Sequence, residues 1–423
     1  MPTPAALPAE DGDNVKNSAA GKEEVANPEK PRSTSLLSKI SDRFDDHSAE
    51  AENTELVLLG SEVSPGTSTR LIWQPMSGFV GLSDPTPILV VNGVKAGPRL
   101  CLTAAVHGDE LNGIEVVRHI LYSTNAEELS GTLIGVPIVN LQGFRRSSRY
   151  LADRRDLNRY FPGNTKGSSA ARIANSFFKN VVSNCDALVD LHTGSFHRTN
   201  LPQLRADLRN PKVLEMARAM GPIVAVQSSG LRGSLRTAAA DAGIPAVTLE
   251  AGRPLELEQS DIDQGIRSVE SLMDALGMIK KRKFWEFKPE PMYYRSRWVR
   301  AKEGGMLFSN VELGQRVHEG DLLGKVTDPI TNAKTDIYSP FNGRIIGMAL
   351  NQVMQPGFAA FHIGLQSSAE SAAEADDPTY PDYEDLDPDG APINPENTAP
   401  GNPNDSDPPD ADANAAELPE DSE

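Results

Sequence analysis

The sequence predicts an α/β protein, with a mixed sheet flanked by helices, followed by a small all-β module. Two observations predict the first part. From about residue 56 to residue 278, apolar runs of strand length alternate with amphipathic helical patterns. Several of these runs are continuously apolar, which is typical of central strands covered on both faces. A third observation predicts the module, because short strand-like runs with frequent glycines replace this alternation after Trp298.

The expected elements follow from these patterns in chain order. Strands are expected at Thr69–Gln74, Pro87–Val94, Arg99–Val106, Thr132–Val139, Ala187–Leu191, Ile223–Gln227 and Ala246–Glu250. Helices are expected at Glu110–Tyr122, Ser168–Val182, Pro211–Ala219, Ser234–Ala242 and Leu257–Leu276.

Four segments are predicted from the changes in composition. We expect residues 1–50 to be a polar, disordered N-terminal extension, residues 51–285 the α/β domain that carries the candidate site, residues 286–365 the small β module and residues 366–423 an acidic, disordered tail. Within the module, Leu313–Gly324 and Ser339–Ile345 resemble a biotinyl/lipoyl-type barrel-sandwich hybrid. The sequence therefore predicts a small all-β module of the barrel-sandwich type.

The formal net charge of −18 belongs to the tail and not to the fold. Residues 366–423 contain 18 acidic residues and no Lys or Arg, so the rest of the chain has 41 of each sign. A segment this acidic, with almost no apolar residues, cannot offset its ordering entropy, and we predict that it is disordered. No basic stripe is visible elsewhere, which argues against nucleic acid as a partner.

The sequence also predicts where the protein works. No run approaches the roughly 18 apolar residues of a membrane span, and residues 1–50 lack the basic start and apolar core of a signal peptide. The two cysteines, Cys101 and Cys185, lie in apolar strand-like runs, so buried thiols in a reducing compartment are expected. We therefore predict a soluble cytoplasmic protein that does not bind membranes.

Two fragments have the residue types of a metal site. His107 ends one apolar run and Glu110 follows three residues later, while His192 ends a second apolar run. Two imidazoles and one carboxylate leave a coordination position open for water or substrate, which is the arrangement of catalytic zinc. Each residue also has a simpler explanation, such as a core histidine or a glutamate favoured by a helix N-terminus. Their shared position at strand ends favours the metal site.

Two further motifs carry charged residues that suit the same site. In Asp153–Gly163, the pair Asn158 and Arg159 could grip a substrate carboxylate, since Arg offers a planar fork of donors, although a solvated charge cluster is the alternative. Glu250 ends an apolar strand, where a carboxylate is costly to bury without a partner. It could act as a general base, pair with an arginine, or serve as a fourth metal ligand.

The order HGDE, NLQGF, DRRDLNRYFPG, DLHTG and TLEAG resembles the succinylglutamate desuccinylase/aspartoacylase family, a branch of the zinc carboxypeptidase-like hydrolases, and specifically its broad unassigned branch. The resemblance covers roughly residues 55–365. It implies that His107, Glu110 and His192 bind zinc, that Glu250 is the general acid/base, and that Asn158 and Arg159 hold the substrate carboxylate. It also implies an upstream arginine that polarises the scissile carbonyl, for which Arg149 and Arg154 both remain candidates, with Arg154 otherwise a substrate contact.

The expected function is therefore zinc-dependent hydrolysis of the amide bond of an N-acyl amino acid or a related small amide with a carboxylate. Two alternatives remain open from the sequence: a metallocarboxypeptidase acting on short or modified peptides, and a binding protein that keeps the fold without turnover. The expected cofactor is zinc and the expected partner a small-molecule substrate. A homo-oligomer is also possible.

Overall fold

The computed structural model describes residues 52–75, 85–280 and 290–365. The predicted N-terminal extension and acidic tail lie outside these described residues. The predicted boundary near residue 285 lies in the gap between the two longer ranges. The four-segment division therefore stays a prediction.

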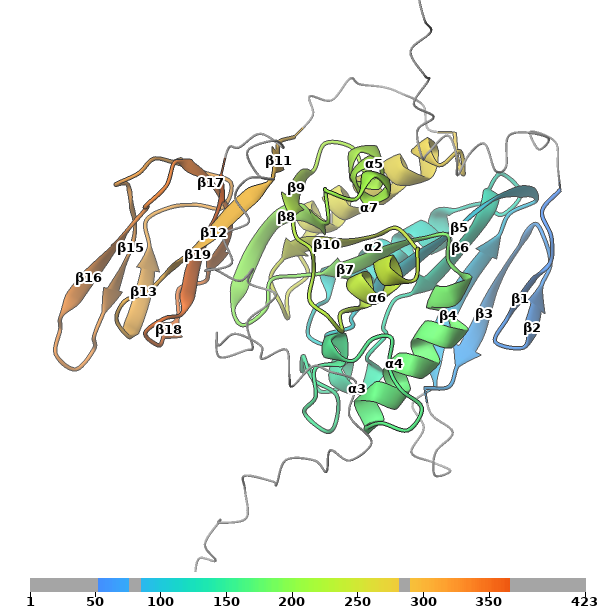
Figure 1. Ribbon diagram of the computed structural model, residues 1–423, viewed down its shortest axis with the longest axis horizontal. Coiled ribbons are helices and arrows are strands. Elements are labelled where there is room, and N and C mark those ends of the chain that lie inside the picture. Colours follow the sequence, from blue (N-terminus) through green and yellow to red (C-terminus); the bar gives the residue numbers. More distant parts are fainter. Residues whose placement is uncertain (1–51, 76–84, 281–289, 366–423) are drawn as a thin grey trace, which may run out of the picture. The chain divides into compact units, whose positions relative to one another are not determined.

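One large mixed sheet forms the centre of the fold (Figure 1). Its middle strands, β6, β5, β7 and β10, are parallel, while β4 and β3 continue one edge in the antiparallel sense. On the other side β8 runs antiparallel to β10, and β9 runs parallel to β8. The strands are β3 (Thr67–Trp73), β4 (Thr86–Asn92), β5 (Lys95–Ala104), β6 (Ser130–Val136), β7 (Ala187–His192), β8 (Arg198–Ala206), β9 (Val224–Gln227) and β10 (Ala246–Gly252).

Helices cover both faces of this sheet, as the alternating sequence pattern predicts. One hydrophobic cluster joins the sheet to α2 (Asn112–Ser123), α5 (Pro211–Ala219) and α7 (Gln259–Ala275). A second cluster on the opposite face joins it to α4 (Ser169–Asn180) and α6 (Leu235–Asp241). The side chains of Ser168, Asn210 and Ser234 accept backbone hydrogen bonds at the N-termini of α4, α5 and α6, so these helices begin at side-chain caps.

Among the described residues, no helix is long and apolar enough to cross a membrane. Shorter elements complete the first part of the chain. The short elements are the hairpin β1 (Leu56–Leu58) and β2 (Ser61–Val63), the helical turn α3 (Leu141–Phe144), and the 3-10 turns at Leu157–Arg159 and Val182–Asn184.

Every strand and helix listed from the sequence is present within a few residues of its expected bounds, and the predicted fold class is confirmed. The long strand β8 was not predicted, for a physical reason. Its sequence is polar and contains Pro202, which normally argues against a central strand. In the structure the β8–β10 register shifts between the pairs Glu250–Gln203 and Gly252–Asn200. Pro202 therefore lies at a β-bulge, where a missing N–H interrupts no regular ladder.

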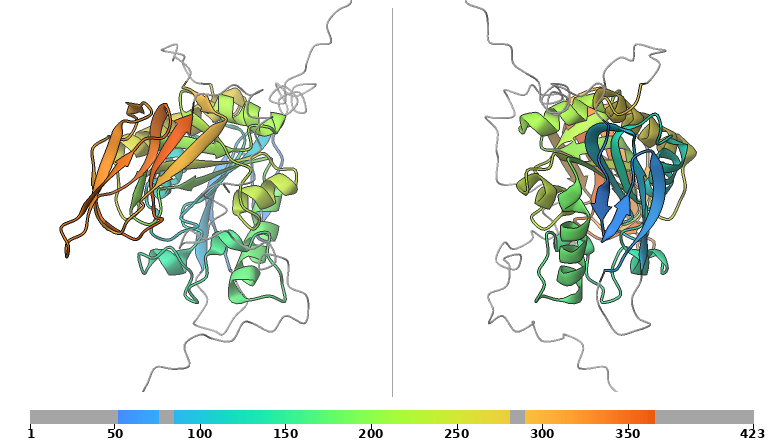
Figure 2. Two further views of the ribbon diagram at one scale, coloured as in Figure 1. Left: turned by 60° about the vertical axis from the view of Figure 1, so that its left-hand side comes forward. Right: turned by 90° about the vertical axis from the view of Figure 1, so that its right-hand side faces the viewer.

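The C-terminal strands form a second sheet and also extend the first one. A four-stranded sheet has the order β16-β15-β13-β18, and a separate hydrophobic core lies between it and β12, β17 and β19. Strand β17 pairs with β8, so the module continues the large sheet directly (Figure 2). The strands are β11 (Met292–Tyr293), β12 (Arg295–Arg300), β13 (Gly305–Ser309), β14 (Arg316–Val317), β15 (Leu322–Thr327), β16 (Lys334–Tyr338), β17 (Gly343–Ala349), β18 (Val353–Met354) and β19 (Ala359–Leu365).

The expectation of two free thiols is wrong. Cys101 and Cys185 form a disulfide, with 5.7 Å between their Cα atoms. Cys101 lies in β5, and Cys185 precedes the neighbouring strand β7 by two residues, so sheet pairing brings the two side chains together. Disulfides are typical of oxidising compartments, and the cytoplasmic location therefore stays a prediction.

Candidate metal and active site

The carboxyl ends of three neighbouring parallel strands position the central side chains. His107 follows β5, His192 is the last residue of β7, and Glu250 lies near the end of β10, paired in register with His192. Parallel α/β sheets place their binding sites at this edge. The turn between His107 and Glu110 passes close to α3, and a side chain on Gly108 would overlap the backbone of Gly143 and Phe144. The glycine of this motif is therefore a packing requirement.

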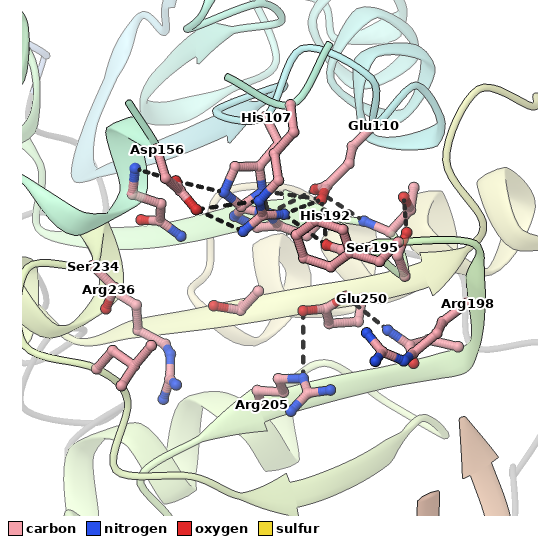
Figure 3. A pocket seen from close by; sticks show the side chains of 18 of the residues that line it. His107, Glu110, Asp156, His192, Ser195, Arg198, Arg205, Ser234, Arg236 and Glu250 are labelled. Atoms are coloured by element: carbon pink, nitrogen blue, oxygen red, sulfur yellow. Dashed lines mark hydrogen bonds and ion pairs between the residues drawn. The ribbon is translucent and has the colours of Figure 1, made fainter. Parts of the chain in front are cut away.

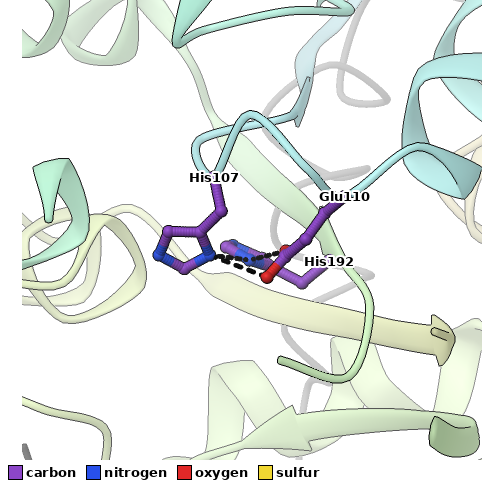
Figure 4. Close-up of side chains that lie close together, drawn as sticks. All are labelled: His107, Glu110 and His192. Carbon is purple, nitrogen blue, oxygen red and sulfur yellow. Dashed lines mark hydrogen bonds and ion pairs between the residues drawn. The ribbon is translucent and has the colours of Figure 1, made fainter. Parts of the chain in front are cut away.

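His107, Glu110 and His192 point toward one another (Figure 4). Among the described residues they are the group of side chains whose donor atoms all lie close enough to hold a metal ion, within 4.8 Å of one another. The Glu110 carboxylate lies 2.9 Å from Nδ1 of His107 and 2.7 Å from Nδ1 of His192. The two Nδ1 atoms are 3.2 Å apart. Zinc bonds of about 2.0–2.2 Å to three such atoms fit a triangle of this size.

Each histidine is held on its outer nitrogen by a carboxylate whose side chain is at most 10% exposed. Nε2 of His107 lies 3.1 Å from Asp156, and Nε2 of His192 lies 2.8 Å from Asp190. A carboxylate at Nε2 favours the tautomer with hydrogen on that nitrogen. The lone pair of Nδ1 is then free to point at the space between His107, Glu110 and His192. Metal-binding histidines in proteins usually have such outer partners. The arrangement therefore fits a cation with two imidazoles and a carboxylate as ligands.

The electrostatics of Glu110 and His192 point the same way. Burial alone would raise the pKa of Glu110, but His107 and His192 hold that pKa far below its usual range. Burial alone would lower the pKa of His192, but Asp190 and Glu110 raise it well above the usual value. Without a cation, a proton must therefore reduce the repulsion between the acceptor atoms at this centre.

Arg149 donates to Glu110, Asp156 and Ser195, which lie around the same pocket (Figure 3). Its guanidinium donates to Asp156 through Nε and Nη2, at 3.1 and 2.8 Å, and to Ser195 Oγ at 2.7 Å. It also reaches Glu110 at 3.3 Å. Burial alone would raise the pKa of Asp156, but Arg149 and then His107 hold it well below the usual range. Asp156 therefore orients both a candidate ligand and a buried arginine.

The two arginines that the sequence left open occupy different positions. Arg149 is buried and lines the pocket that contains His107 and Glu110. Arg154 is exposed in the loop before Asp156, has a left-handed backbone (φ 64°), and is not among the residues that line this pocket. The geometry favours Arg149 as the group nearer the chemistry.

Asn158 and Arg159 also line the pocket. The Asn158 side-chain oxygen accepts a hydrogen bond from the Leu235 backbone N–H at 2.8 Å, which ties the loop to the start of α6. Arg159 donates to the Asn158 carbonyl at 3.0 Å and lies 3.9 Å from Asp156. The pair is thus anchored by its neighbours while remaining part of the pocket wall.

Glu250 is held from the unpredicted strand β8. Asn200 donates to one carboxylate oxygen at 2.9 Å, and Arg205 Nε lies 3.3 Å from the other. Sequence reasoning missed both residues because their strand was missed. The pocket wall contains further residues that the sequence did not single out, namely Thr193, Gly194, Ser195, Phe196, Arg198, Leu231, Ser234, Arg236, Thr248 and Trp298.

The pocket is small and positively charged. Its free volume is about 80 Å³, well below the roughly 300–1,000 Å³ of typical ligand sites. Five arginines and three carboxylates line it, so its side chains carry a net positive charge before any metal is counted. Such a cavity suits a small anionic molecule.

Known proteins share sequence and fold with this chain. Residues 96–276 match the sequence model of the succinylglutamate desuccinylase/aspartoacylase catalytic domain. The N-alpha-acetyl-L-2,4-diaminobutyric acid deacetylase of Halomonas elongata is 28% identical over 257 residues, which cover 57% of this chain and 74% of that protein.

Two crystal structures show the same arrangement over most of the chain. A succinylglutamate desuccinylase from Silicibacter sp. TM1040 has a TM-score of 0.63 at 25% identity, covering 70% of this chain and 94% of the other. A succinylglutamate desuccinylase/aspartoacylase from Rhodobacter sphaeroides has a TM-score of 0.64 at 21% identity, covering 74% and 100%. The second likeness concerns the fold alone.

Proposed function

The chain belongs to the succinylglutamate desuccinylase/aspartoacylase family, and from this premise we propose that it is a zinc-dependent deacylase. Its substrate would be an N-acyl amino acid or a related small amide with a free carboxylate. The observation that carries the proposal is the convergence of His107 Nδ1, Glu110 and His192 Nδ1, with a carboxylate behind each imidazole.

His107, Glu110 and His192 would hold the metal. Zinc, when bound, would polarise the scissile carbonyl and lower the pKa of a water molecule. Asp156 and Asp190 keep Nδ1 of each histidine directed at the centre, so the protein holds the ligands in place before the metal arrives.

Glu250 is the proposed general base and acid. Its register position opposite His192 places it in the same pocket as the ligand group. It would take the proton of the attacking water and deliver it to the leaving amine, which is required because an amine leaves poorly as an anion. Asn200 and Arg205 hold its two oxygens and so fix the direction of the carboxylate.

Arg149 is proposed to donate a hydrogen bond to the carbonyl oxygen as negative charge develops there. Its guanidinium is pinned by Asp156 and Ser195, so little reorganisation is needed when the charge appears. Asn158 and Arg159 would hold the carboxylate of the amino acid through charge-assisted hydrogen bonds. Arg236 also lines the pocket, is 4% exposed and donates to the carbonyl and hydroxyl oxygens of Ser228, and it adds positive charge to the pocket wall.

The size of the cavity favours a small amide over a peptide. A free volume of about 80 Å³ leaves little room for additional residues, which a carboxypeptidase would have to accommodate. A rate with a dipeptide or tripeptide that exceeds every rate with acylated amino acids would support the peptidase alternative instead.

The proposal is tested by metal content and by Glu250→Gln. The purified protein should hold about one zinc per chain, and a chelator should remove both metal and activity on acylated amino acids.

Glu250→Gln should keep zinc and thermal stability but lose about 10²–10⁴-fold in kcat, because only the proton acceptor is removed. Glu256→Gln, an exposed glutamate outside the pocket, is the control. Loss of zinc in Glu250→Gln would instead make Glu250 a ligand, and a chain without metal or turnover would point to a binding protein.

A further inference from the structure

One wall of the pocket comes from the C-terminal module. Trp298 lies in β12 and lines the pocket. Its ring stacks on His362 of β19, with centroids 4.5 Å apart and planes 9° from parallel. On the catalytic side, the Arg198 guanidinium lies 5.3 Å from the centre of the Trp298 ring and 4.3 Å from that of Phe358. The indole on β12 is therefore held between β19 of the module and β8 of the α/β domain.

Several contacts fix the position of Arg198 in this wall. It is 5% exposed, and its Nε donates to the Ala359 carbonyl at 3.0 Å. Contact with two aromatic rings satisfies the faces of the guanidinium, as cation–π geometry allows. Moving the indole would disturb the Arg198 contacts and the stack on His362 together, so Trp298 is a rigid wall rather than a mobile side chain.

The wall lies opposite the proposed carboxylate grip. In Figure 3, Ser234 and Arg236 lie on one side of Glu250 and Arg198 lies on the other. Asn158 contacts the start of α6 and so belongs to the side of Ser234. A substrate whose amino-acid carboxylate is held by Asn158 and Arg159 would place its scissile bond near Glu250, with the acyl group extending toward Trp298.

We propose that Trp298 is the residue that determines acyl-chain length, and that it restricts the substrate to a short, uncharged acyl group. This inference rests on the proposed deacylase function and specifies the substrate class of the same site. The indole lines the acyl side of a cavity of about 80 Å³. Each methylene group added to the acyl chain of the substrate would therefore have to displace a ring that is held by His362 and Arg198.

The groups behind the indole support an uncharged acyl group. Burial, followed by Arg205 and Arg198, lowers the pKa of His362 well below its usual value, so this imidazole is neutral and cannot pair with an acyl carboxylate. Arg205 already faces Glu250, and Arg198 is engaged by two rings and a carbonyl. The acyl side therefore presents aromatic surface, whereas the opposite side presents the arginines suited to a carboxylate.

The test compares acyl groups on a constant amine. Acetyl, butyryl, hexanoyl and succinyl derivatives of L-glutamate and of L-2,4-diaminobutyrate are assayed with the zinc-loaded full chain. The wild type should favour acetyl over hexanoyl by about 100-fold in kcat/KM, in line with the discrimination expected from a few methylene groups. Trp298→Ala should reduce that preference at least about ten-fold by improving the longer chain, and Trp298→Phe should give an intermediate ratio.

Controls separate this inference from the proposed function. Phe308→Ala removes an aromatic ring from β13 of the same module, 51% exposed and outside the pocket, and should leave the acyl preference unchanged. An unchanged preference in Trp298→Ala and Trp298→Phe, with zinc and melting temperature retained, overturns the inference while leaving the deacylase intact. Wild-type preference for succinyl or hexanoyl also overturns it. No hydrolysis of any derivative contradicts the deacylase and this inference together.

Discussion

At the scale of single residues, the site combines groups that bind charge with groups that hold them in place. Asp156 illustrates the second role, because one carboxylate contacts His107, Arg149 and the backbone N–H of Asn158. A single carboxylate therefore positions a candidate metal ligand, the candidate carbonyl-polarising arginine and the loop of the candidate carboxylate-binding pair. Residues with this role have no sequence signature of their own, since an aspartate in a loop rich in charge resembles a solvated one.

Arg159 provides the residue-scale prediction. Arg159→Ala should raise KM by at least about ten-fold for acylated amino acids and much less for the matching amides without a carboxylate, because a charge-assisted bidentate contact is lost. Arg159→Lys should restore only part of the loss, since an ammonium keeps the charge and not the planar fork. Arg155→Ala, a neighbouring arginine paired with Asp153 and outside the pocket, is the control. Equal losses for both substrate types would mean that Arg159 only supports the loop.

At the scale of elements, the ligands were predictable and much of the surrounding wall was not. His107 and His192 each follow an apolar run, and parallel strands bring such ends together. Asn200 and Arg205 lie on β8, whose proline and polar residues argue against a strand in any local pattern. Trp298 belongs to the module. The module reaches the pocket because β17 pairs with β8, although the paired residues lie about 150 positions apart in the sequence. Tertiary pairing of this kind leaves no local periodicity.

The start of α7 gives a prediction for stability. Burial, and then the nearby Glu258, raise the pKa of Asp261 to about 6 in the folded protein, from 3.8. The folded state therefore holds this proton more tightly than the unfolded chain, so stability falls as pH rises from about 4 to about 6 and is level beyond. Asp261→Asn should remove this loss and gain about 1 kcal/mol at pH 7.5, a value reduced for partial exposure and for the lost helix-dipole interaction.

Chemical denaturation at a series of pH values measures this effect. The difference in unfolding free energy between Asp261→Asn and the wild type should grow between pH 4 and pH 6.5. Asp263→Asn, which changes another carboxylate of α7, should show no such growth. A difference for Asp261→Asn that does not vary with pH would contradict the raised pKa.

At the scale of the whole molecule, the disulfide joins the two strands that lead to the histidines. Cys101 lies six residues before His107, and Cys185 lies seven residues before His192. The bridge closes a segment of 84 residues, and such a bridge stabilises a protein by roughly 2–5 kcal/mol. We expect a reductant to lower the melting temperature of the wild type by several degrees.

A Cys101→Ala/Cys185→Ala double variant provides the control for this prediction, because its melting temperature should not respond to reductant. When the wild-type protein is unfolded in the absence of reductant, thiol titration should find no free thiol. Two reactive thiols per chain would mean that the protein is purified in the reduced form, in agreement with a reducing compartment.

The position of this bridge also determines what a protease would leave behind. The exposed Arg154 lies between the two cysteines in sequence, so trypsin cleavage after it would divide the chain into two pieces that stay covalently linked. One piece would carry His107 and Glu110, and the other would carry His192 and Glu250. The nicked protein should run as one band in non-reducing electrophoresis and as two bands after reduction. Retained activity in that nicked form would show that continuity of the backbone between the ligands is dispensable once the fold is made.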